Sequence, residues 1–321
     1  MSEIKPLLSI GIPIFNGEAY LTENLNSIVN QVGQYLFDKI EVIISDNASE
    51  DNTKKISLDY CNNYKYIKYF ENNENIGFDR NLDLIFKRAT GDFVWLLGDD
   101  DEIRYGAIQR VLDLILKSPK LSIIFVNYDN NIKVLSDKDE IFSNPEDFLY
   151  YTSFKIGLLS CNIIKKDEWN MINSSFYFDS GWVHVGVILE VLSIKNTTSA
   201  MISDYLVIQG AKKKEKSWGG KGTFIFIGLA LVDIFKKKMP ELKYNKKIIN
   251  FSISVIKGGY FKYIPLAKAK GLKFNKALFR RFYNCYKSYP TFWIFDLPLL
   301  VIPNNVYFII YKIVKIFKKS I

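Results

Sequence analysis

The segment FVWLLGDDD, residues 93–101, places three successive aspartates directly after a short apolar run. A run of this length is typical of a buried β-strand, so the carboxylates are predicted at the point where a strand ends. Three adjacent carboxylates repel one another, and a fold that gathers them usually supplies a cation. Oxygen ligands suit Mg²⁺ or Mn²⁺. We therefore predict a divalent-metal site at Asp99, Asp100 and Asp101, with a solvated acidic turn as the alternative.

On both sides of this segment, short apolar runs alternate with stretches whose apolar residues recur at helical spacing. Strands are predicted over residues 7–14, 40–45, 66–70, 93–97 and 121–128, and helices over residues 18–29, 52–61, 79–88 and 103–116. This alternation predicts an α/β fold with an open, mostly parallel sheet flanked by helices. Ligands of such sheets bind at the carboxyl ends of the strands. Asn16, Asp46 and the triple aspartate all follow predicted strands, which indicates a ligand site at that edge.

After about residue 130 the alternation becomes less regular. A surface loop is predicted over residues 130–144, strands over 157–164 and 200–208, a helix over 182–193 and a second loop over 209–222. The second loop is rich in lysine and glycine. Its lysines either close over a phosphate-bearing ligand or lie in solvent.

Composition limits the class of protein. Hydrophobic residues make up 48% and aromatic residues 15% of the 321 residues, too much for an intrinsically disordered chain. Cys61, Cys161 and Cys285 form no CxxC pair. We therefore expect neither a structural zinc site nor a disulfide framework, in keeping with a reducing cytosol. No signal peptide and no run of about 18 apolar residues is evident, so we expect no membrane-spanning helix.

Charge is distributed unevenly along the chain. Of the net charge of +9, residues 246–321 carry +14 and the first 245 residues carry −5. The segment Asn305–Ser320 interleaves aromatic and aliphatic residues with lysines, a pattern typical of helices that lie in a bilayer interface. Tyr283–Ile302 adds aromatic residues of the kind found at lipid boundaries. We expect this region to bind an anionic membrane surface; packing against the rest of the chain or against a dimer partner is the alternative.

The chain contains neither the G-x-G-x-x-G motif of dinucleotide-binding sites nor the G-x-x-x-x-G-K-[ST] motif of P-loops, which argues against both kinds of site. Other polar residues at the predicted strand ends have two readings each. Asp46 either hydrogen-bonds a nucleobase or caps the next helix. Phe15 and Asn16 either hold a base or belong to a turn.

Four segments carry a family resemblance: IGIPIFNGEAYL (10–21), EVIISDNASEDNT (41–53), NENIGFDRNLD (73–83) and GDFVWLLGDDDE (91–102). In order and spacing they resemble the nucleotide-binding half of family 2 inverting glycosyltransferases, in particular a bacterial polysaccharide branch that resembles abequosyltransferases. The resemblance implies a GT-A fold, a nucleotide-diphosphate sugar donor and a Mn²⁺ or Mg²⁺ cofactor. It also implies a catalytic domain over residues 1–225, with a nucleotide-binding half (1–130) and an acceptor half (131–225). The basic, aromatic, helical region then covers residues 226–321.

Through the same resemblance, individual residues are expected to bind the donor. Those that match the family's motifs are Pro13, Phe15 and Glu18 at the nucleoside, Asp46 at the base, and Arg80, Asn81 and Asp99 beside the donor. For the metal, alignment with the family's acidic motif makes Asp100 the principal ligand, whereas strand alternation places Asp99 and Asp101 on one face. All three aspartates therefore stay candidates.

The catalytic base does not follow from the family motif. An inverting transfer needs a group that removes the proton from the acceptor hydroxyl. The family's Glu-Asp pair is missing, and the segment FDSGWVH (178–184) stands in its place. Asp179 and His184, the only histidine, are the two candidates.

We therefore expect an inverting glycosyltransferase whose acceptor is a lipid-linked oligosaccharide made for a surface polysaccharide. It would be cytoplasmic and peripheral on the inner face of the cell membrane. A nucleotidyltransferase is the rival enzyme, but the first strand lacks the glycine- and basic-rich phosphate loop expected of one. A nucleic-acid binder is the other rival, and the acidic clusters argue against it because phosphate backbones need a continuous basic track. The sequence does not predict the oligomeric state.

Overall fold

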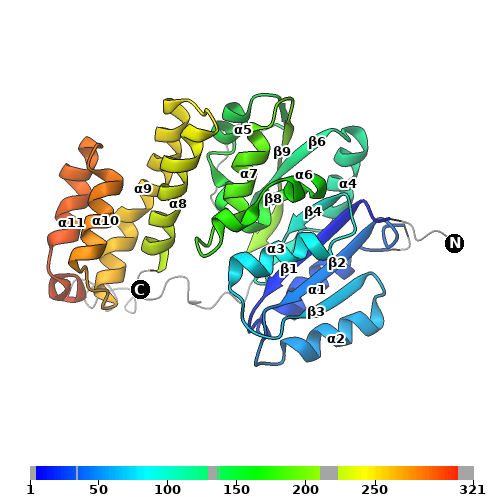
Figure 1. Ribbon diagram of the computed structural model, residues 1–321. Coiled ribbons are helices and arrows are strands. Elements are labelled where there is room, and N and C mark those ends of the chain that lie inside the picture. Colours follow the sequence, from blue (N-terminus) through cyan, green and yellow to red (C-terminus); the bar gives the residue numbers. More distant parts are fainter. Residues whose placement is uncertain (1–4, 34, 129–135, 137, 210–222, 310–321) are drawn as a thin grey trace. The chain divides into compact units, whose positions relative to one another are not determined.

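The computed structural model of the chain describes residues 5–33, 35–128, 136, 138–209 and 223–309 (Figure 1). The chain divides into two compact units, Met1–Lys213 and Lys214–Ile321. The lysines predicted to face a phosphate, Lys212 to Lys216, lie outside the described residues, as does the predicted amphipathic tail from residue 310 onward. The second region was expected to begin at residue 226, and its first described helix begins at Thr223.

The first unit alternates strands and helices as predicted. Its first half contains β1 (Leu8–Ile14), α1 (Leu21–Val29), β2 (Ile40–Asp46), α2 (Thr53–Asn63), β3 (Ile67–Glu71), α3 (Phe78–Arg88), β4 (Phe93–Leu96), β5 (Asp101–Ile103), α4 (Ala107–Lys117) and β6 (Leu121–Tyr128). Its second half contains β7 (Glu140–Phe142), α5 (Pro145–Tyr151), β8 (Asn162–Lys165), α6 (Lys166–Met171), α7 (Val183–Ser193) and β9 (Thr198–Gln209). Short 3₁₀ turns cover Lys155–Gly157, Leu159–Cys161 and Ser174–Tyr177.

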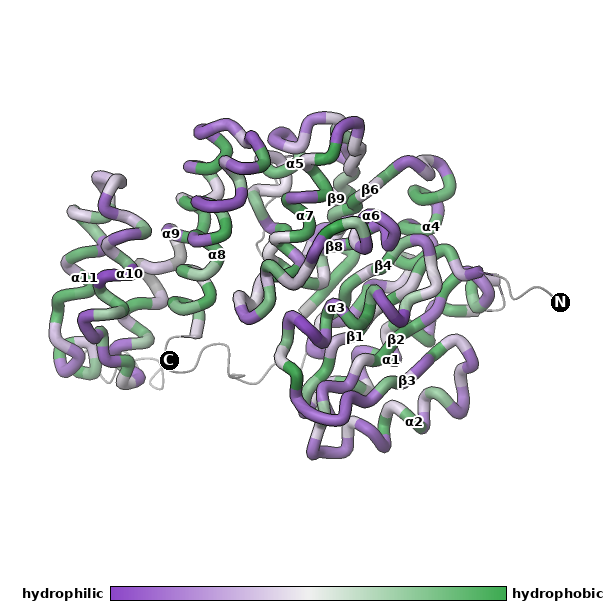
Figure 2. Tube along the Cα trace, viewed as in Figure 1, coloured by the Kyte–Doolittle hydropathy of each residue, from purple (hydrophilic) through white to green (hydrophobic). Residues whose placement is uncertain are grey.

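Within the described residues, nine strands form one sheet in the order β3-β2-β1-β4-β8-β6-β9-β5, with β7 paired to β9. The first four are parallel neighbours, whereas β8 runs antiparallel to both β4 and β6. Every residue of β1 and β2 is buried, because helices cover both faces of a parallel sheet. Figure 2 shows mostly hydrophilic residues along α2, whose two buried residues, Thr53 and Ser57, lie one turn apart. The prediction of an open α/β sheet flanked by helices is confirmed.

Three predicted elements were wrong in part. The helix predicted over residues 103–116 begins only at Ala107, after Gly106 with a φ of 85°, and Asp101–Ile103 is instead a strand paired with β9. The strand predicted over 157–164 is extended only from Asn162. The loop predicted over 130–144 contains β7, which also pairs with β9. Each difference depends on a partner far along the chain, which local periodicity does not reveal.

The described part of the second unit is helical, as predicted. It contains α8 (Thr223–Glu241), α9 (Lys246–Ala269), α10 (Lys276–Tyr286), a π-helical turn (Phe292–Asp296) and α11 (Leu297–Val301). Aromatic side chains form its core, with Tyr260 packed edge-on against Phe282 and Tyr286 at ring distances of 5.1 and 5.6 Å. Among the described helices, none combines the length and apolar character that crossing a bilayer requires.

Candidate active site

The acidic turn after β4 is anchored by Asp101. This residue is 9% exposed, and its two carboxylate oxygens accept hydrogen bonds from Tyr128 Oη (2.7 Å) and Ser160 Oγ (2.6 Å). Burial and the neighbouring Asp101 raise the pKa of Tyr128, so its hydroxyl stays protonated and donates. The side chain of Asn24 on α1 donates to the backbone carbonyls of Gly98 (2.9 Å) and Asp101 (2.7 Å). Asp101 therefore holds the turn in place.

Asp99 and Asp100 are half-buried and occupy the middle of the same turn. A Cβ placed on Gly17 would lie 3.0 Å from Asp99 Oδ2, so Asp99 faces the loop that follows β1. A Cβ placed on Gly98 would lie 3.1 Å from Asp101 Oδ2, 3.3 Å from Ser160 Oγ and 3.5 Å from Asp100 Oδ1, so the turn packs closely around this glycine.

A divalent cation needs several oxygen ligands that meet at one place. In the part of the chain that the structure describes, no three His, Cys, Asp and Glu side chains form a metal-binding group. Mg²⁺ is commonly held by one or two carboxylates, with substrate phosphates and water completing the shell. Asp99 and Asp100, which are half-buried and adjacent, fit that role by their number and ligand type. Asp101 accepts hydrogen bonds from Tyr128 and Ser160.

The loop after β1 interlocks with the start of α2. The backbone N–H of Gly17 donates to Thr53 Oγ1 (2.9 Å). Glu18 Oε2 accepts from the backbone N–H and the side-chain amide of Asn52, at 2.9 and 2.7 Å. The structure thus gives Glu18, predicted to line a nucleoside pocket, the role of joining two loops at the carboxyl edge of the sheet.

The other two residues predicted for the nucleoside differ in exposure. Pro13 is buried within β1, where its backbone pairs in register with Ser45 of β2. Phe15, one residue past the end of β1, is 46% exposed. Phe15 therefore presents a ring to solvent at the carboxyl edge, whereas Pro13 does not line the surface.

Asp46 is fully buried at the end of β2. Its Oδ1 accepts from the backbone N–H and hydroxyl of Ser49, at 2.9 and 2.5 Å, and its Oδ2 accepts from Tyr69 Oη at 2.7 Å. The alternative of a helix cap was wrong, because α2 begins at Thr53 and its N-cap residue, Asn52, makes no side-chain cap. A base N–H could donate to Asp46 only by reaching a fully buried carboxylate whose two oxygens already accept hydrogen bonds.

Asn81 is also buried, at 2% exposure, and faces the sheet rather than a ligand. Its side chain accepts from Ser45 Oγ (2.7 Å) and Asn72 Nδ2 (2.9 Å) and donates to the carbonyl of Ser45 (2.8 Å). Arg88 donates to Ser45 and Asn72 as well, at 2.6 and 2.8 Å. This network joins α3 to the ends of β2 and β3, so Asn81 supports the edge from below.

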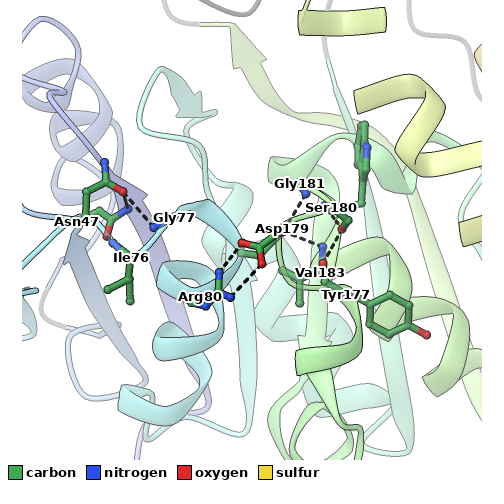
Figure 3. Close-up of polar contacts among 12 residues, drawn as sticks. Asn47, Ile76, Gly77, Arg80, Tyr177, Asp179, Ser180, Gly181 and Val183 are labelled. Carbon is green, nitrogen blue, oxygen red and sulfur yellow. Dashed lines mark hydrogen bonds and ion pairs between the residues drawn. The ribbon is translucent and has the colours of Figure 1, made fainter. Parts of the chain in front are cut away.

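On the other face of α3, Arg80 reaches the segment before α7. Figure 3 shows its guanidinium facing the carboxylate of Asp179, with two hydrogen bonds of 2.5 and 3.0 Å. The guanidinium also lies 5.0 Å from the centre of the Phe178 ring. Asp179 has a φ of 64°, a left-handed conformation that is strained for a residue other than glycine. The ion pair therefore stabilises a strained residue that carries an exposed carboxylate.

Asp79 fixes the same segment from its other side. It is 3% exposed, and its two oxygens accept the backbone N–H groups of Gly181 (2.8 Å) and Val183 (3.1 Å). Burial raises the pKa of Asp79, and these backbone hydrogen bonds oppose the shift. A carboxylate at this position satisfies N–H groups that the first turn of α7 leaves without helical partners.

The two candidates for the base have opposite surroundings. The side chain of Asp179 is 73% exposed, and its hydrogen bond with Arg80 holds the pKa of the carboxyl below its ordinary value of 3.8. His184 is 2% exposed, and burial lowers its pKa to about 4, so the imidazole is neutral at pH 7. Its Nε2 lies 3.4 Å from the carbonyl of Gly157, and its Nδ1 makes no hydrogen bond. Of the two, only Asp179 presents its proton-accepting atoms to solvent.

Contacts connect the loops of the four parallel strands in one line. Asp99 borders the loop after β1, and the backbone N–H of Asn16 in that loop donates to Ser49 after β2 (2.8 Å). Asn47 Nδ2 then donates to Asn75 after β3 (2.8 Å), and α3 carries Arg80 to Asp179. The loops after β4, β1, β2 and β3 thus adjoin one another along one edge, and α3 extends this line to Asp179.

Sequence reasoning missed the residues that hold these groups in place: Asn24, Asp79, Tyr128 and Ser160. Asp79 stood beside Arg80 in a segment that was already singled out, but nothing local marked its carboxylate as buried. The partners of Tyr128 and Ser160 lie 27 and 59 residues away, so no spacing in the sequence could have indicated them.

Comparison with known sequences identifies relatives. Residues 9–174 match glycosyl transferase family 2. Abequosyltransferase RfbV of Salmonella typhimurium is 31% identical over 260 residues, which span 74% of this chain and 78% of that protein. A GalNAc(5)-diNAcBac-PP-undecaprenol beta-1,3-glucosyltransferase of Campylobacter jejuni is 36% identical over 108 residues, which cover 33% of this chain and 34% of that protein.

Solved structures share the fold. TarS 1-349 of S. aureus in complex with UDP-GlcNAc matches with a TM-score of 0.63 at 14% identity, covering 88% of this chain and 80% of that one. Mannosyltransferase PcManGT from Pyrobaculum calidifontis, in complex with GDP-Man and Mn²⁺, matches with a TM-score of 0.60 at 16% identity, covering 92% and 85%. At such identities the likeness concerns the fold alone, and it confirms the expected GT-A fold.

Proposed function

Because the chain belongs to glycosyl transferase family 2 and is a glycosyltransferase, we propose that it moves a sugar from a nucleoside-diphosphate sugar to an acceptor hydroxyl with inversion. The acceptor we propose is a lipid-linked oligosaccharide in the synthesis of a surface polysaccharide. The observation that carries the proposal is the line of contacts along the carboxyl edge, which joins Asp99 and Asp100 to Asp179 through four loops.

The donor is proposed to lie over the ends of β1 and β4. Phe15 offers an exposed aromatic face to the base. Asp99 and Asp100 would hold Mg²⁺ or Mn²⁺, which when bound neutralises charge on the diphosphate leaving group. That TarS was solved with UDP-GlcNAc and PcManGT with GDP-Man and Mn²⁺ supports a donor of this class. Asp46 and Asn81 support these loops from within the protein.

Asp179 is proposed as the general base. Its carboxylate takes the proton of the acceptor hydroxyl while that oxygen forms a bond to the anomeric carbon of the donor. The bond from the anomeric carbon to the diphosphate breaks in the same step, and the nucleoside diphosphate leaves with the bonding electrons. Since attack and departure occur on opposite faces, the anomeric configuration inverts. Exposure favours Asp179 over His184, which lies buried beneath this surface.

Arg80 has two roles in this proposal. Without donor, its guanidinium pairs with Asp179 and keeps the carboxylate ionised but weakly basic. A bound diphosphate competes for the same guanidinium, because phosphate oxygens match its bidentate geometry equally well. Release of Asp179 then raises the pKa of its carboxyl, and the base becomes stronger when the donor is in place.

We further propose that the enzyme is cytoplasmic and peripheral on the inner face of the cell membrane. The name of the Campylobacter jejuni relative includes a PP-undecaprenol carrier, which supports an acceptor held in a bilayer. The charge of +14 over residues 246–321 supports attraction to anionic lipid.

Thermal-shift binding tests the donor site. UDP, GDP, CDP and TDP are each added with and without Mn²⁺ to the wild type, to an Asp99→Asn/Asp100→Asn variant and to an Asp59→Asn control on the exposed side of α2. One nucleotide is expected to stabilise the wild type and the control by about 2.7 kcal/mol at 100 times its Kd, and only with Mn²⁺. The corresponding sugar donor should then yield a product of inverted configuration by NMR. Failure of every nucleotide to stabilise the wild type contradicts the proposal.

A further inference from the structure

Three successive large apolar residues are exposed in the π-helical turn between α10 and α11. Trp293 is 47%, Ile294 64% and Phe295 53% exposed. The residues at the two ends of the same turn point inward, since Phe292 is 0% and Asp296 4% exposed. Exposed apolar residues continue along the chain at Val301 (62%), Phe308 (46%) and Ile309 (56%). Single exposed apolar side chains are ordinary, but a contiguous group on one turn indicates a surface that meets a partner.

Buried contacts hold this turn in its exposed position. Asp296 pairs with Lys257 of α9 at 2.9 Å, and both side chains are largely buried. The ammonium of Lys257 also donates to Thr291, directly before the turn. The indole N–H of Trp293 donates to the carbonyl of Lys287 at 2.9 Å. The outward direction of the three apolar side chains is therefore set by the packing of the turn against the second unit.

In the described residues 246–309 the exposed charge has a single sign, whereas Asp233 of α8 pairs with Arg281 of α10 at 2.8 Å. Asp296 is the only acidic residue in 246–321, and it is buried and paired. Across the described residues 246–309, every exposed charged side chain is therefore positive: Lys246, Lys247, Lys273, Lys276, Arg280 and Lys287. Lys287 lies closest to the turn in sequence, with its ammonium 5.3 Å from the ring centre of Tyr283, against which Trp293 packs edge-on. Lys287 thus places one exposed cation beside the aromatic residues of the turn.

We propose that the turn Trp293–Ile294–Phe295 inserts into the interface of an anionic lipid bilayer. The lipid tails receive the apolar side chains, the indole lies at headgroup level, and the exposed cations meet the lipid phosphates. A second copy of the chain fits less well, because a symmetric contact brings positive surfaces together. Nucleic acid fits less well too, since Ile294 can neither stack on a base nor donate to a phosphate. This inference rests on the proposed function, because the proposed lipid-linked acceptor is what brings the protein to a membrane. Its test, however, does not require sugar transfer.

Vesicle co-sedimentation of the full chain tests the insertion. Vesicles of phosphatidylcholine alone and of phosphatidylcholine with phosphatidylglycerol are used at low salt. The compared proteins are the wild type, Ile294→Ser/Phe295→Ser, Lys287→Gln, and a matched control, Met171→Ser/Phe176→Ser, whose residues are 73% and 72% exposed on the first unit. These positions are exposed, so circular dichroism should show every variant folded.

We expect binding to the anionic vesicles only. Ile294→Ser/Phe295→Ser should weaken it more than about ten-fold, because binding scales with the apolar area inserted. Lys287→Gln should weaken it about five-fold, the factor that corresponds to about 1 kcal/mol per basic residue near the surface. The Met171/Phe176 control should bind as the wild type does. The proposal is overturned if the Ile294/Phe295 variant binds the vesicles as well as the control does. It is also overturned if the wild type does not bind vesicles and instead forms a dimer that this variant dissociates. Sugar transfer to a water-soluble acceptor, measured without lipid, separates such a failure from a failure of the proposed function.

Discussion

Replacing Asp79 by asparagine should separate the positioning of the base from the stability of the fold. The carboxylate accepts two backbone N–H groups at the start of α7, from Gly181 at 2.8 Å and Val183 at 3.1 Å. An asparagine amide keeps one accepting oxygen and turns an NH₂ group toward the other donor. A buried donor without a partner costs about 1–3 kcal/mol, and the lost negative charge at a helix N-terminus adds about 0.3–1 kcal/mol. We therefore expect a loss of about 1.3–4 kcal/mol, or about 3–15 °C in Tm.

The kinetic effect follows from the position of Asp179, two residues before Gly181. When the hydrogen bonds from Asp79 are lost, the segment that holds the base is free to shift, and a displacement of about 1 Å can lower a rate about 100-fold. We expect Asp79→Asn to lower kcat by about that factor, measured below the Tm of the variant. KM for the nucleotide-sugar donor should change less than kcat, because Phe15, Asp99 and Asp100 lie on other loops.

Asp83 supplies the matched control, one turn further along α3. It is 4% exposed and accepts from Trp169 Nε1 (3.0 Å), Ser174 Oγ (2.7 Å) and Lys87 Nζ (2.7 Å). Asp83→Asn should therefore lose a comparable free energy of unfolding, while kcat stays within about three-fold because its partners precede the base segment. An equal fall of kcat in both variants, or an unchanged Tm for Asp79→Asn, would refute the positioning argument.

Four further outcomes are expected. Asp179→Asn should lower kcat about 10²–10⁴-fold, whereas His184→Gln should leave the pH profile unchanged between pH 5 and 8, because the imidazole is already neutral there; steady-state kinetics check both. Arg80→Gln removes the partner that lowers the pKa of Asp179, so the acidic limb of kcat/KM measured at low donor concentration should move to higher pH. For Asp83 burial raises the pKa, but hydrogen bonds from Lys87, Ser174 and Trp169 bring it below the ordinary value of 3.8. Its contribution to stability is therefore full above pH 3.8 and is lost as the pH falls further, and urea unfolding should show a weaker acid dependence in Asp83→Asn than in the wild type.

The sheet was predictable because its strands are short apolar runs that parallel pairing buries on both faces. β1, β2 and β6 lie within one or two residues of their predicted bounds. β5 and β7, which are three residues long and pair with β9, were not predicted. Asp101–Ile103 has no strand pattern of its own, and its extended form results from hydrogen bonds to Val207–Gln209 about a hundred residues away. Local periodicity reports burial, but it does not report which distant strand completes a pairing.

The candidate site was predictable as a place more than as a set of roles. Polar residues after strands gather at one edge because parallel strands all end there. Whether such a residue faces a ligand or the protein depends on neighbours that the sequence does not order. Asp46 and Asp101 both follow apolar strands, yet both accept hydrogen bonds from tyrosines and serines inside the protein. Asp99 and Asp100 share the same local pattern but lie half-buried in the turn after β4, where Asp99 faces the loop that follows β1.

α3 explains how the predicted base is held in a fixed position relative to the predicted donor site. Residues two positions apart in an α-helix point in directions about 200° apart. Asp79 and Asn81 therefore project from opposite sides of α3. Asn81 bonds to the end of β2, in the half predicted to bind the nucleotide, whereas Asp79 bonds to Gly181 and Val183 in the other half. Asp79 and Asp83 share a face, as residues four apart do, and both bond to that second half. α3 therefore holds Asp179 in a fixed position relative to the edge of the sheet. The proposed base can thus come from the loop before α7, although the family's Glu-Asp pair is missing.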